Sequence, residues 1–203
     1  MTRRDAAIVL MMLLGAAGLT ICGCGGGGGG GGVQQATVTG TVRDDAGLQP
    51  VNNARVEANG DVAFTNAAGE FTLQTTAGNK DLEITKTGYQ DLTLSRNLVV
   101  GDNSIGTRYL QPELQAGHGA ATGKVRRNGV GVAGVVVHGD TQATTKADGS
   151  YAIYNLTAGE RGLLAVDPAT QAVGFTSVNI TAGQTTGGAD IDLNLEPPAE
   201  PVF

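Results

Sequence analysis

The sequence Thr-Asn-Ala-Ala-Gly-Glu-Phe-Thr-Leu at residues 65–73 decides the fold, and it returns about 80 residues later as Thr-Lys-Ala-Asp-Gly-Ser-Tyr-Ala-Ile at residues 145–153. In each copy a glycine lies where a tight turn needs a positive φ, and an aromatic residue that starts an alternating strand follows closely. The alternation places Phe71 and Leu73 on one face, with Glu70 and Thr72 on the other. We therefore predict a β-turn followed by a half-buried strand in both places.

The same order of signals extends over two longer segments, 36–112 and 118–198. Each begins with Thr-Gly-x-Val, continues through a valine-containing strand and the turn just described, and ends with Leu-x-Pro. Chance aligns a few threonines and glycines but not so many signals in one order, so we infer an internal duplication. About seven short strands separated by Gly, Asn and Asp turns fit each copy. The prediction is an all-β fold of two tandem seven-stranded antiparallel β-sandwiches.

These motifs resemble those of the carboxypeptidase regulatory-like family, a transthyretin-like (prealbumin-like) sandwich that is also similar to the B-type repeats of collagen adhesins. Residues 37–89 match the pattern, including its closing pair Gly88-Tyr89, whereas the second copy matches through Ile153 and lacks a Gly-Tyr pair around residues 168–175. The resemblance implies modules that serve as spacers, stabilisers or binding surfaces. It carries over no catalytic residues.

The N-terminus begins with a positive pair, Arg3 and Arg4, followed by an apolar stretch at residues 6–21. This stretch is typical of an export signal and is shorter than the roughly 20 residues that span a bilayer. Its end resembles the lipobox of bacterial lipoproteins, in which a small residue precedes a lipidated cysteine. Cys24, preceded by Gly23, fits better than Cys22. We predict lipidation at Cys24, with a cleaved leader without lipid and an uncleaved anchor as the alternatives.

Eight consecutive glycines follow at residues 25–32. They contribute no side chain to a core and lose much backbone entropy on ordering, so we expect a flexible poly-Gly tether with an end-to-end distance of about 16 Å. The predicted organisation is a signal peptide at 1–23, the lipidated cysteine and tether at 24–35, the first sandwich at 36–112, a linker at 113–117, the second sandwich at 118–198 and a disordered tail at 199–203.

Composition limits the partners. The chain has 13 Lys and Arg against 19 Asp and Glu, a formal net charge of −6, so we expect no nucleic-acid partner. Both cysteines lie in or beside the leader, so we expect no disulfide in the folded part. The two histidines, His118 and His138, and the acidic pairs 44–45 and 190/192 lack the further ligands of a metal site.

Catalytic patterns are also missing from the sequence. The serines have neither a flanking glycine elbow nor a histidine at a recognisable spacing. Strand alternation turns Lys124 and Asn194 outward, where water keeps the lysine charged, which argues against an isopeptide crosslink between them. We predict a protein that is not an enzyme and binds no cofactor and no metal.

The functional hypothesis follows from the leader and the repeats. We expect a membrane-tethered cell-envelope lipoprotein, at the outer membrane or cell surface, that acts as a spacer or a protein-interaction module, with exposed strand edges as docking sites. Its partners would be the membrane, through the lipid anchor, and cell-envelope proteins. The alternative is a polysaccharide-binding surface module in which exposed aromatic residues stack on sugar rings. Tyr154 and Phe64 are the candidates for those contacts.

Overall fold

The computed structural model describes residues 33–194, and their regular structure is β-strand. The predicted signal peptide, Cys24, the eight glycines at 25–32 and the tail at 199–203 lie outside the described residues. These described residues form one compact unit. The strands of its first half are β1 (Gln35–Asp44), β2 (Arg55–Ala58), β3 (Asp61–Phe64), β4 (Glu70–Thr76), β5 (Gly78–Thr85), β6 (Leu92–Leu98) and β7 (Gly101–Leu110).

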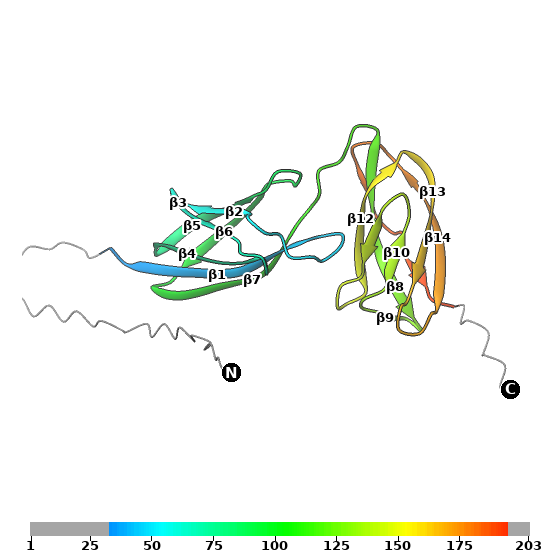
Figure 1. Ribbon diagram of the computed structural model, residues 1–203, viewed down its shortest axis with the longest axis horizontal. Coiled ribbons are helices and arrows are strands. Elements are labelled where there is room, and N and C mark those ends of the chain that lie inside the picture. The colour runs from blue at the N-terminus through cyan, green and yellow to red at the C-terminus, as the bar shows by residue number, and fades with distance from the viewer. Residues whose placement is uncertain (1–32, 195–203) are drawn as a thin grey trace, which may run out of the picture. The chain divides into compact units, whose positions relative to one another are not determined.

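The first half is a sandwich of two sheets, which we call the N-terminal sandwich. One sheet has the order β4-β1-β7 and the other β3-β2-β5-β6 (Figure 1). Strand β1 lies in the middle of the first sheet, antiparallel to β4 and parallel to β7. The inward-facing apolar residues of both sheets meet in one core, whose fully buried members include Val38, Val56, Leu73, Leu82 and Ile84.

Two glycines of the N-terminal sandwich are required by their surroundings. Gly40 faces the core, where a Cβ atom would lie 2.7 Å from Ile105 Cγ1 and 2.9 Å from the Phe71 ring. Gly69 adopts a φ of 77°, and a Cβ there would lie 2.3 Å from the Val42 carbonyl oxygen. The predicted turn is therefore confirmed, with Phe71 and Leu73 buried and Glu70 and Thr72 exposed.

The strands of the second half form a second pair of sheets, the C-terminal sandwich. One sheet contains β12-β8-β15 with β9 and β16 also paired to β8, and the other has the order β11-β10-β13-β14 (Figure 1). These strands are β8 (His118–Arg127), β9 (Val130–Gly131), β10 (Val136–His138), β11 (Gln142–Thr144), β12 (Ser150–Thr157), β13 (Gly159–Val166), β14 (Val173–Ile180), β15 (Thr185–Thr186) and β16 (Ile191–Asp192).

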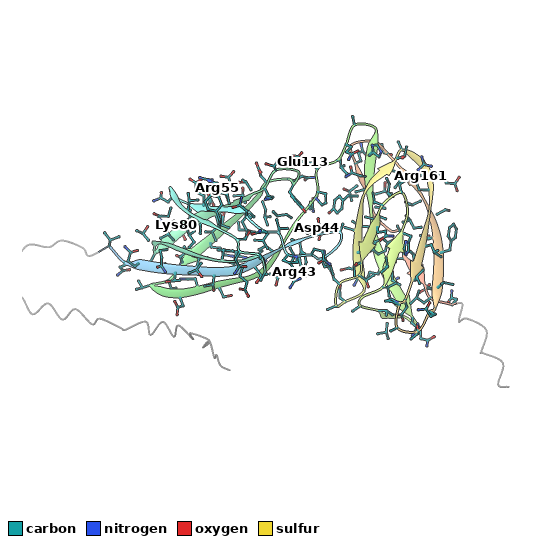
Figure 2. The ribbon with its side chains drawn as sticks, in the orientation of Figure 1. Arg43, Asp44, Arg55, Lys80, Glu113 and Arg161 are labelled. Atoms are coloured by element: carbon teal, nitrogen blue, oxygen red, sulfur yellow. The ribbon has the colours of Figure 1, made fainter. Side chains whose placement is uncertain are left out.

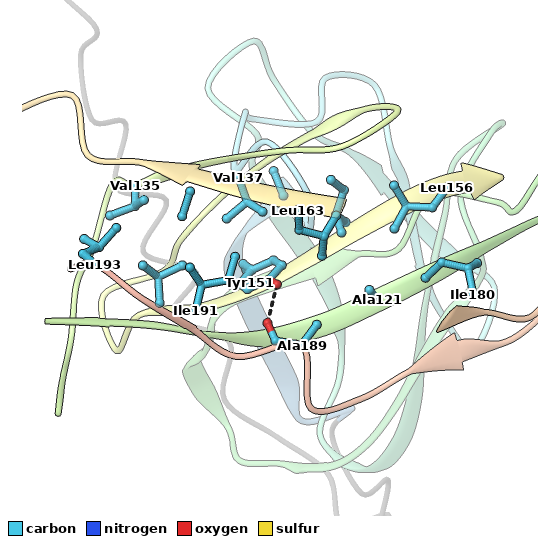
Figure 3. Close-up of a cluster of buried hydrophobic side chains, with 14 of the residues drawn as sticks. Ala121, Val135, Val137, Tyr151, Leu156, Leu163, Ile180, Ala189, Ile191 and Leu193 are labelled. Carbon is cyan, nitrogen blue, oxygen red and sulfur yellow. Dashed lines mark hydrogen bonds between the residues drawn. The ribbon is translucent and has the colours of Figure 1, made fainter. Parts of the chain in front are cut away.

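The core of the C-terminal sandwich is separate from that of the first and is drawn in Figure 3. Tyr151 lies inside it with 2% of its surface exposed, and its hydroxyl donates to the Ala189 carbonyl oxygen at 2.5 Å. That bond satisfies the one polar atom that the ring brings into an apolar interior. Burial raises the pKa of Tyr151 well above its usual range.

The predicted all-β fold is confirmed, and two details differ from the expectation. The C-terminal sandwich has nine strands rather than seven, and three of them, β9, β15 and β16, are two-residue pairings with β8. The sheets are also not purely antiparallel: β7 pairs parallel with β1, and β15 and β16 pair parallel with β8. The predicted domain boundaries stay a prediction.

Equivalent threonines make the same hydrogen bonds in both sandwiches. Thr65 Oγ1 donates to the Val51 carbonyl at 2.6 Å and accepts from the Ala54 amide at 2.8 Å. Thr145 Oγ1 donates to the Val132 carbonyl at 2.6 Å and accepts from the Val135 amide at 2.9 Å. Each buried hydroxyl thus fixes the loop that precedes a core strand, at matching places in the two halves.

Candidate interaction surfaces

The two aromatic residues that the sequence proposed as surface contacts have different environments. Phe64, on the edge strand β3, is 56% exposed, as expected. Tyr154 is only 5% exposed, so the prediction of a free ring was wrong. Its strand does turn it to the outer face of the C-terminal sandwich, but Ala46 and Leu114 from outside that sandwich pack over it, together with Ala120 and Ala152 of the same face.

Tyr154 belongs to a small polar group that we call the Asp45 cluster, formed by Asp45, Lys146 and Tyr154. Asp45 follows β1, and one of its carboxylate oxygens accepts from Lys146 Nζ at 2.5 Å while the other accepts from the Tyr154 hydroxyl at 2.6 Å. The Asp45 side chain is 8% exposed and that of Lys146 is 25% exposed. A buried carboxylate needs such partners, so removing either leaves an uncompensated group.

Contacts around the Asp45 cluster strengthen it. Lys146 Nζ lies 4.5 Å from the centre of the Tyr109 ring, a cation–π arrangement with β7. The Thr144 amide donates to the Ala46 carbonyl at 2.8 Å. Burial, followed by the hydrogen bond to Asp45, raises the pKa of Tyr154 well above its usual range, so the phenol stays protonated and remains a donor.

The loop that presents Asp45, residues 45–49, is shaped by its own polar groups. Asp44 Oδ1 accepts from the amides of Ala46 and Gly47, at 2.9 and 2.5 Å, and Arg43 donates to the Leu48 carbonyl at 2.8 Å. Figure 2 labels Arg43 and Asp44 at the start of this loop. Leu48 has a φ of 59°, which closes the turn back toward Pro50. The aspartate at the loop start therefore holds the shape that carries Asp45 to its partners.

The predicted linker, residues 113–117, is bonded to both sandwiches. The Glu113 amide donates to the Gly88 carbonyl at 3.0 Å. Asn155, at a bulge in β12 with a φ of 59°, accepts from the Gln115 amide at 2.8 Å and donates to the Glu113 carbonyl at 3.3 Å. Because its backbone is hydrogen-bonded to both sandwiches, the linker is an ordered connection between them.

Part of the outer surface of the C-terminal sandwich is apolar and exposed, which the sequence did not lead us to expect. Leu164 and Phe175 are directly paired across β13 and β14 and are 42% and 68% exposed. The Phe175 ring lies over Gly162, where a Cβ would be 2.8 Å from the ring. Alternation places Phe175 on the face opposite buried Gly174, but a glycine does not mark the core face in a sequence, so no local signal identified Phe175 as exposed.

A groove of about 450 Å³ lies beside the Asp45 cluster, over the outer face of β8 and β12. Its charged groups are paired: Arg126 contacts Asp190 at 2.8 Å, and Lys124 contacts Asp148 at 3.4 Å. The hydrogen bond from Arg126, and next that from the Lys124 amide, lower the pKa of Asp190. The groove therefore offers neutralised ion pairs rather than a concentrated charge.

Other classes of site were sought in the described part of the chain. Residues 33–194 contain no cluster of three or more His, Cys, Asp or Glu side chains arranged to hold a metal ion. In the same range, no helix has the length and apolar character needed to cross a bilayer. Lys124 and Asn194 are both exposed, as strand alternation predicted.

One family model matches most of the N-terminal sandwich. Residues 37–107 match the model of the carboxypeptidase regulatory-like domain. This match supports the resemblance seen in residues 37–89. Membership of the chain in that family stays a prediction, and none of the curated proteins matches the chain.

Several solved structures are similar to the chain. A chain of a type II cohesin–X-dockerin complex from Acetivibrio cellulolyticus is 24% identical, with a TM-score of 0.32, over 36% of this chain and 52% of that chain. A minor pilin of Streptococcus agalactiae is 13% identical, with a TM-score of 0.30, over 82% and 98%. A streptococcal ancillary pilin is 12% identical, with a TM-score of 0.29, over 81% and 63%. At these identities and TM-scores the likeness carries no functional argument.

Proposed function

We propose that this chain is a non-enzymatic cell-envelope lipoprotein, tethered to a membrane through Cys24, in which two tandem sandwich modules act as a spacer or a protein-interaction module. The observation that carries the proposal is the Asp45 cluster. A buried carboxylate with two partners in the other sandwich, beside a linker bonded on both sides, holds the modules in one arrangement. A fixed joint sets a defined separation between whatever the two ends contact, which a flexible linker would not.

The joint is tested by measuring distances between spin labels placed at the exposed residues Glu83 and Ser177, in the chain carrying Cys22→Ala and Cys24→Ala. We expect a narrow distance distribution for the otherwise unchanged chain. Asn155→Ala combined with Lys146→Gln should broaden it, because both attachments are then weakened. A broad distribution before these substitutions would contradict the spacer function.

The anchor is tested separately, with a matched pair of cysteine variants in a host that processes lipoproteins. Cys24→Ala should abolish incorporation of labelled palmitate and release the protein from the membrane fraction, whereas Cys22→Ala should leave both unchanged. The reverse pattern would move the anchor to Cys22. Absence of label in the unmodified protein would overturn the lipoprotein proposal.

A second candidate function is binding of polysaccharide, and the exposed face around Phe175 favours it. An aromatic ring standing free on a sheet, next to exposed Leu164 and above Gly162, is the kind of platform on which sugar rings stack. Phe175→Ser and Phe64→Ser should then lower retention of the protein on isolated cell-wall polysaccharide. Val130→Ser, at a residue 69% exposed, is the control. Unchanged retention in all three variants would exclude this candidate.

A further inference from the structure

The first and last strands of the N-terminal sandwich lie side by side and run in the same direction (Figure 1). Their ladder contains eight residue pairs, from Ala36 opposite Gly101 to Asp44 opposite Leu110, with one irregularity near Gly40. Because the pairing is parallel, the chain enters the sandwich at the start of β1 and leaves it at the opposite end, where β7 finishes. Tension applied to the two chain ends therefore pulls β1 and β7 past each other.

This geometry decides how hydrogen bonds share a load. When two paired strands are pulled along their axes in opposite directions, all bonds of the ladder are loaded together and must fail together. When the same strands are pulled apart at one end, the bonds fail one after another. Rupture under tension is governed by the barrier to unfolding, and the first geometry raises that barrier. An antiparallel pairing of first and last strands would give the second geometry.

The C-terminal sandwich repeats the arrangement with a shorter ladder. Strand β8, which follows the linker, pairs parallel with β15, at Thr185 opposite Ala120, and with β16, at Ile191 opposite Val125. Between them the chain departs from the ladder. There the Ala189 amide donates to the Thr122 carbonyl at 3.0 Å, and the Asp190 side chain accepts from the Lys124 amide and from the Arg126 side chain, both at 2.8 Å.

We infer that the chain carries tensile load along its length, with each sandwich loaded in shear between its first strand and its last. The inference deepens the proposed spacer, because only a protein tethered at one end and engaged at the other is stretched in this direction. The N-terminal sandwich is the stronger element, since its ladder is longer and almost continuous. The C-terminal sandwich, with two residue pairs in each of β15 and β16, yields first.

The test compares two pulling directions on one sandwich by single-molecule force spectroscopy, using the chain with Cys22→Ala and Cys24→Ala. Handles attached through Gln34→Cys and Gln111→Cys load opposite ends of the β1–β7 ladder. Handles attached through Gln34→Cys and Val100→Cys load the same end. All three positions are exposed and lie outside the ladder. At one loading rate we expect the opposite-end pair to unfold at a force several-fold higher than the same-end pair.

A second set of variants repeats the comparison on the C-terminal sandwich and guards against a folding defect in the first. Ala116→Cys with Asn194→Cys loads opposite ends, and Ala116→Cys with Ala182→Cys loads the same end. We expect the same direction of difference and a lower opposite-end force than in the N-terminal sandwich. Equal forces in the two directions, or a higher same-end force, in either properly folded set would overturn the inference.

The outcome is independent of the proposed function. Suppose that the two pulling directions give equal forces, while Cys24 carries palmitate and the spin-label distances are narrowly distributed. The spacer proposal would then hold, and the inference that the spacer carries tension would be wrong. A large directional difference together with an unlabelled Cys24 and a flexible joint would remove the tethered spacer, and the ladders would then be mechanical features without the proposed setting.

Discussion

The outer faces of β12–β8 and β4–β1 are equivalent surfaces of the two sandwiches with opposite exposure. In the C-terminal sandwich the face presents Ala120, Ala152 and Tyr154, all buried beneath residues from outside that sandwich. In the N-terminal sandwich the matching surface carries Thr72 and Gln74, which are exposed. The docking face therefore differs from its hydrated counterpart by small apolar residues and one aromatic residue on the same scaffold.

The loop after β1 and the turn after β8, which occupy equivalent places in the two sandwiches, also differ. After β1, residues 45–49 form the loop that supplies Asp45 and Ala46 to the docking face. After β8, the chain turns directly through Asn128 and Gly129, with φ of 52° and 79°. The N-terminal sandwich thus has the projecting loop and the C-terminal sandwich has the face that receives it, which explains why a single joint forms among the described residues.

The largest effect is expected where the comparison is strongest, at Tyr154 and its counterpart Gln74. Tyr154→Ala removes a buried ring and leaves the Asp45 carboxylate with one donor fewer, so the free energy of unfolding should fall by about 3 kcal/mol. Gln74→Ala, on the exposed face, should change it by less than about 0.5 kcal/mol. Urea denaturation of both variants measures the difference. A similar loss in the two variants would mean that the docking face contributes nothing to stability.

The next effect tests what the sandwiches share. Thr65→Val and Thr145→Val keep the side-chain volume but remove a hydroxyl that makes two hydrogen bonds to buried backbone groups. Each should lower the free energy of unfolding by about 2 kcal/mol, because an amide and a carbonyl lose their partner. Hydrogen exchange followed by mass spectrometry assigns the loss to one sandwich or the other. Unequal losses would show that the two sites are similar in geometry and different in energetics.

Local patterns explain which features could be predicted from the sequence. The turns at Gly69 and Gly149 and the inward aromatic residues Phe71 and Tyr151 follow from φ preference and alternation within a few residues. Alternation also placed Tyr154 on the correct face. It could not show that loop 45–49 covers this face, because burial there depends on residues more than 100 positions away.

The direction of β7 relative to β1 was equally beyond the sequence. A strand pattern of alternating residues reports which side chains face the core and is the same for a parallel and an antiparallel neighbour. The exposed Phe175 was missed for a related reason, since the second copy lacks the Gly-Tyr pair that anchored the reading of the first. What is set by distant segments of the chain had to come from the structure.

A smaller effect is expected from weakening the joint by one charge. Lys146→Gln removes the ammonium group beside Asp45 but leaves the Tyr154 hydroxyl as its donor, and the lysine side chain is 25% exposed. The free energy of unfolding should therefore fall by about 1 kcal/mol, less than for a fully buried ion pair. Lys124→Gln, whose partner Asp148 lies at an exposed site, is the matched control and should change it by less than about 0.5 kcal/mol. Equal effects in urea denaturation would place the Asp45 pair among ordinary surface pairs.

The smallest expected effect is a loss of stability of the C-terminal sandwich at acidic pH. Hydrogen bonds from the Ser150 side chain and then its amide lower the pKa of Asp148 to about 2. Hydrogen bonds from Thr170 and then the Ala169 amide lower the pKa of Asp167. A folded-state pKa below the usual value of about 3.9 means that the ionised form stabilises the fold above that pH, and the contribution is lost as the pH falls through the folded-state pKa. Acidification from about pH 4 to pH 2 should therefore weaken the C-terminal sandwich.

Ser150→Ala isolates this term. Without the hydroxyl, the pKa of Asp148 should rise from about 2 toward about 3.9, and the stability that the ionised carboxylate contributes above that pH should shrink toward zero. Carbon-13 NMR of the aspartate carboxyl groups follows the titration directly. In the N-terminal sandwich, Glu70 is the counterpart of Ser150. The turn there is held by Asn66, whose amide oxygen Oδ1 accepts from the amides of Ala68 and Glu70 and does not titrate. An unchanged Asp148 titration would show that the hydroxyl is not the cause, and would assign the low pKa to the Ser150 amide and then to Lys124.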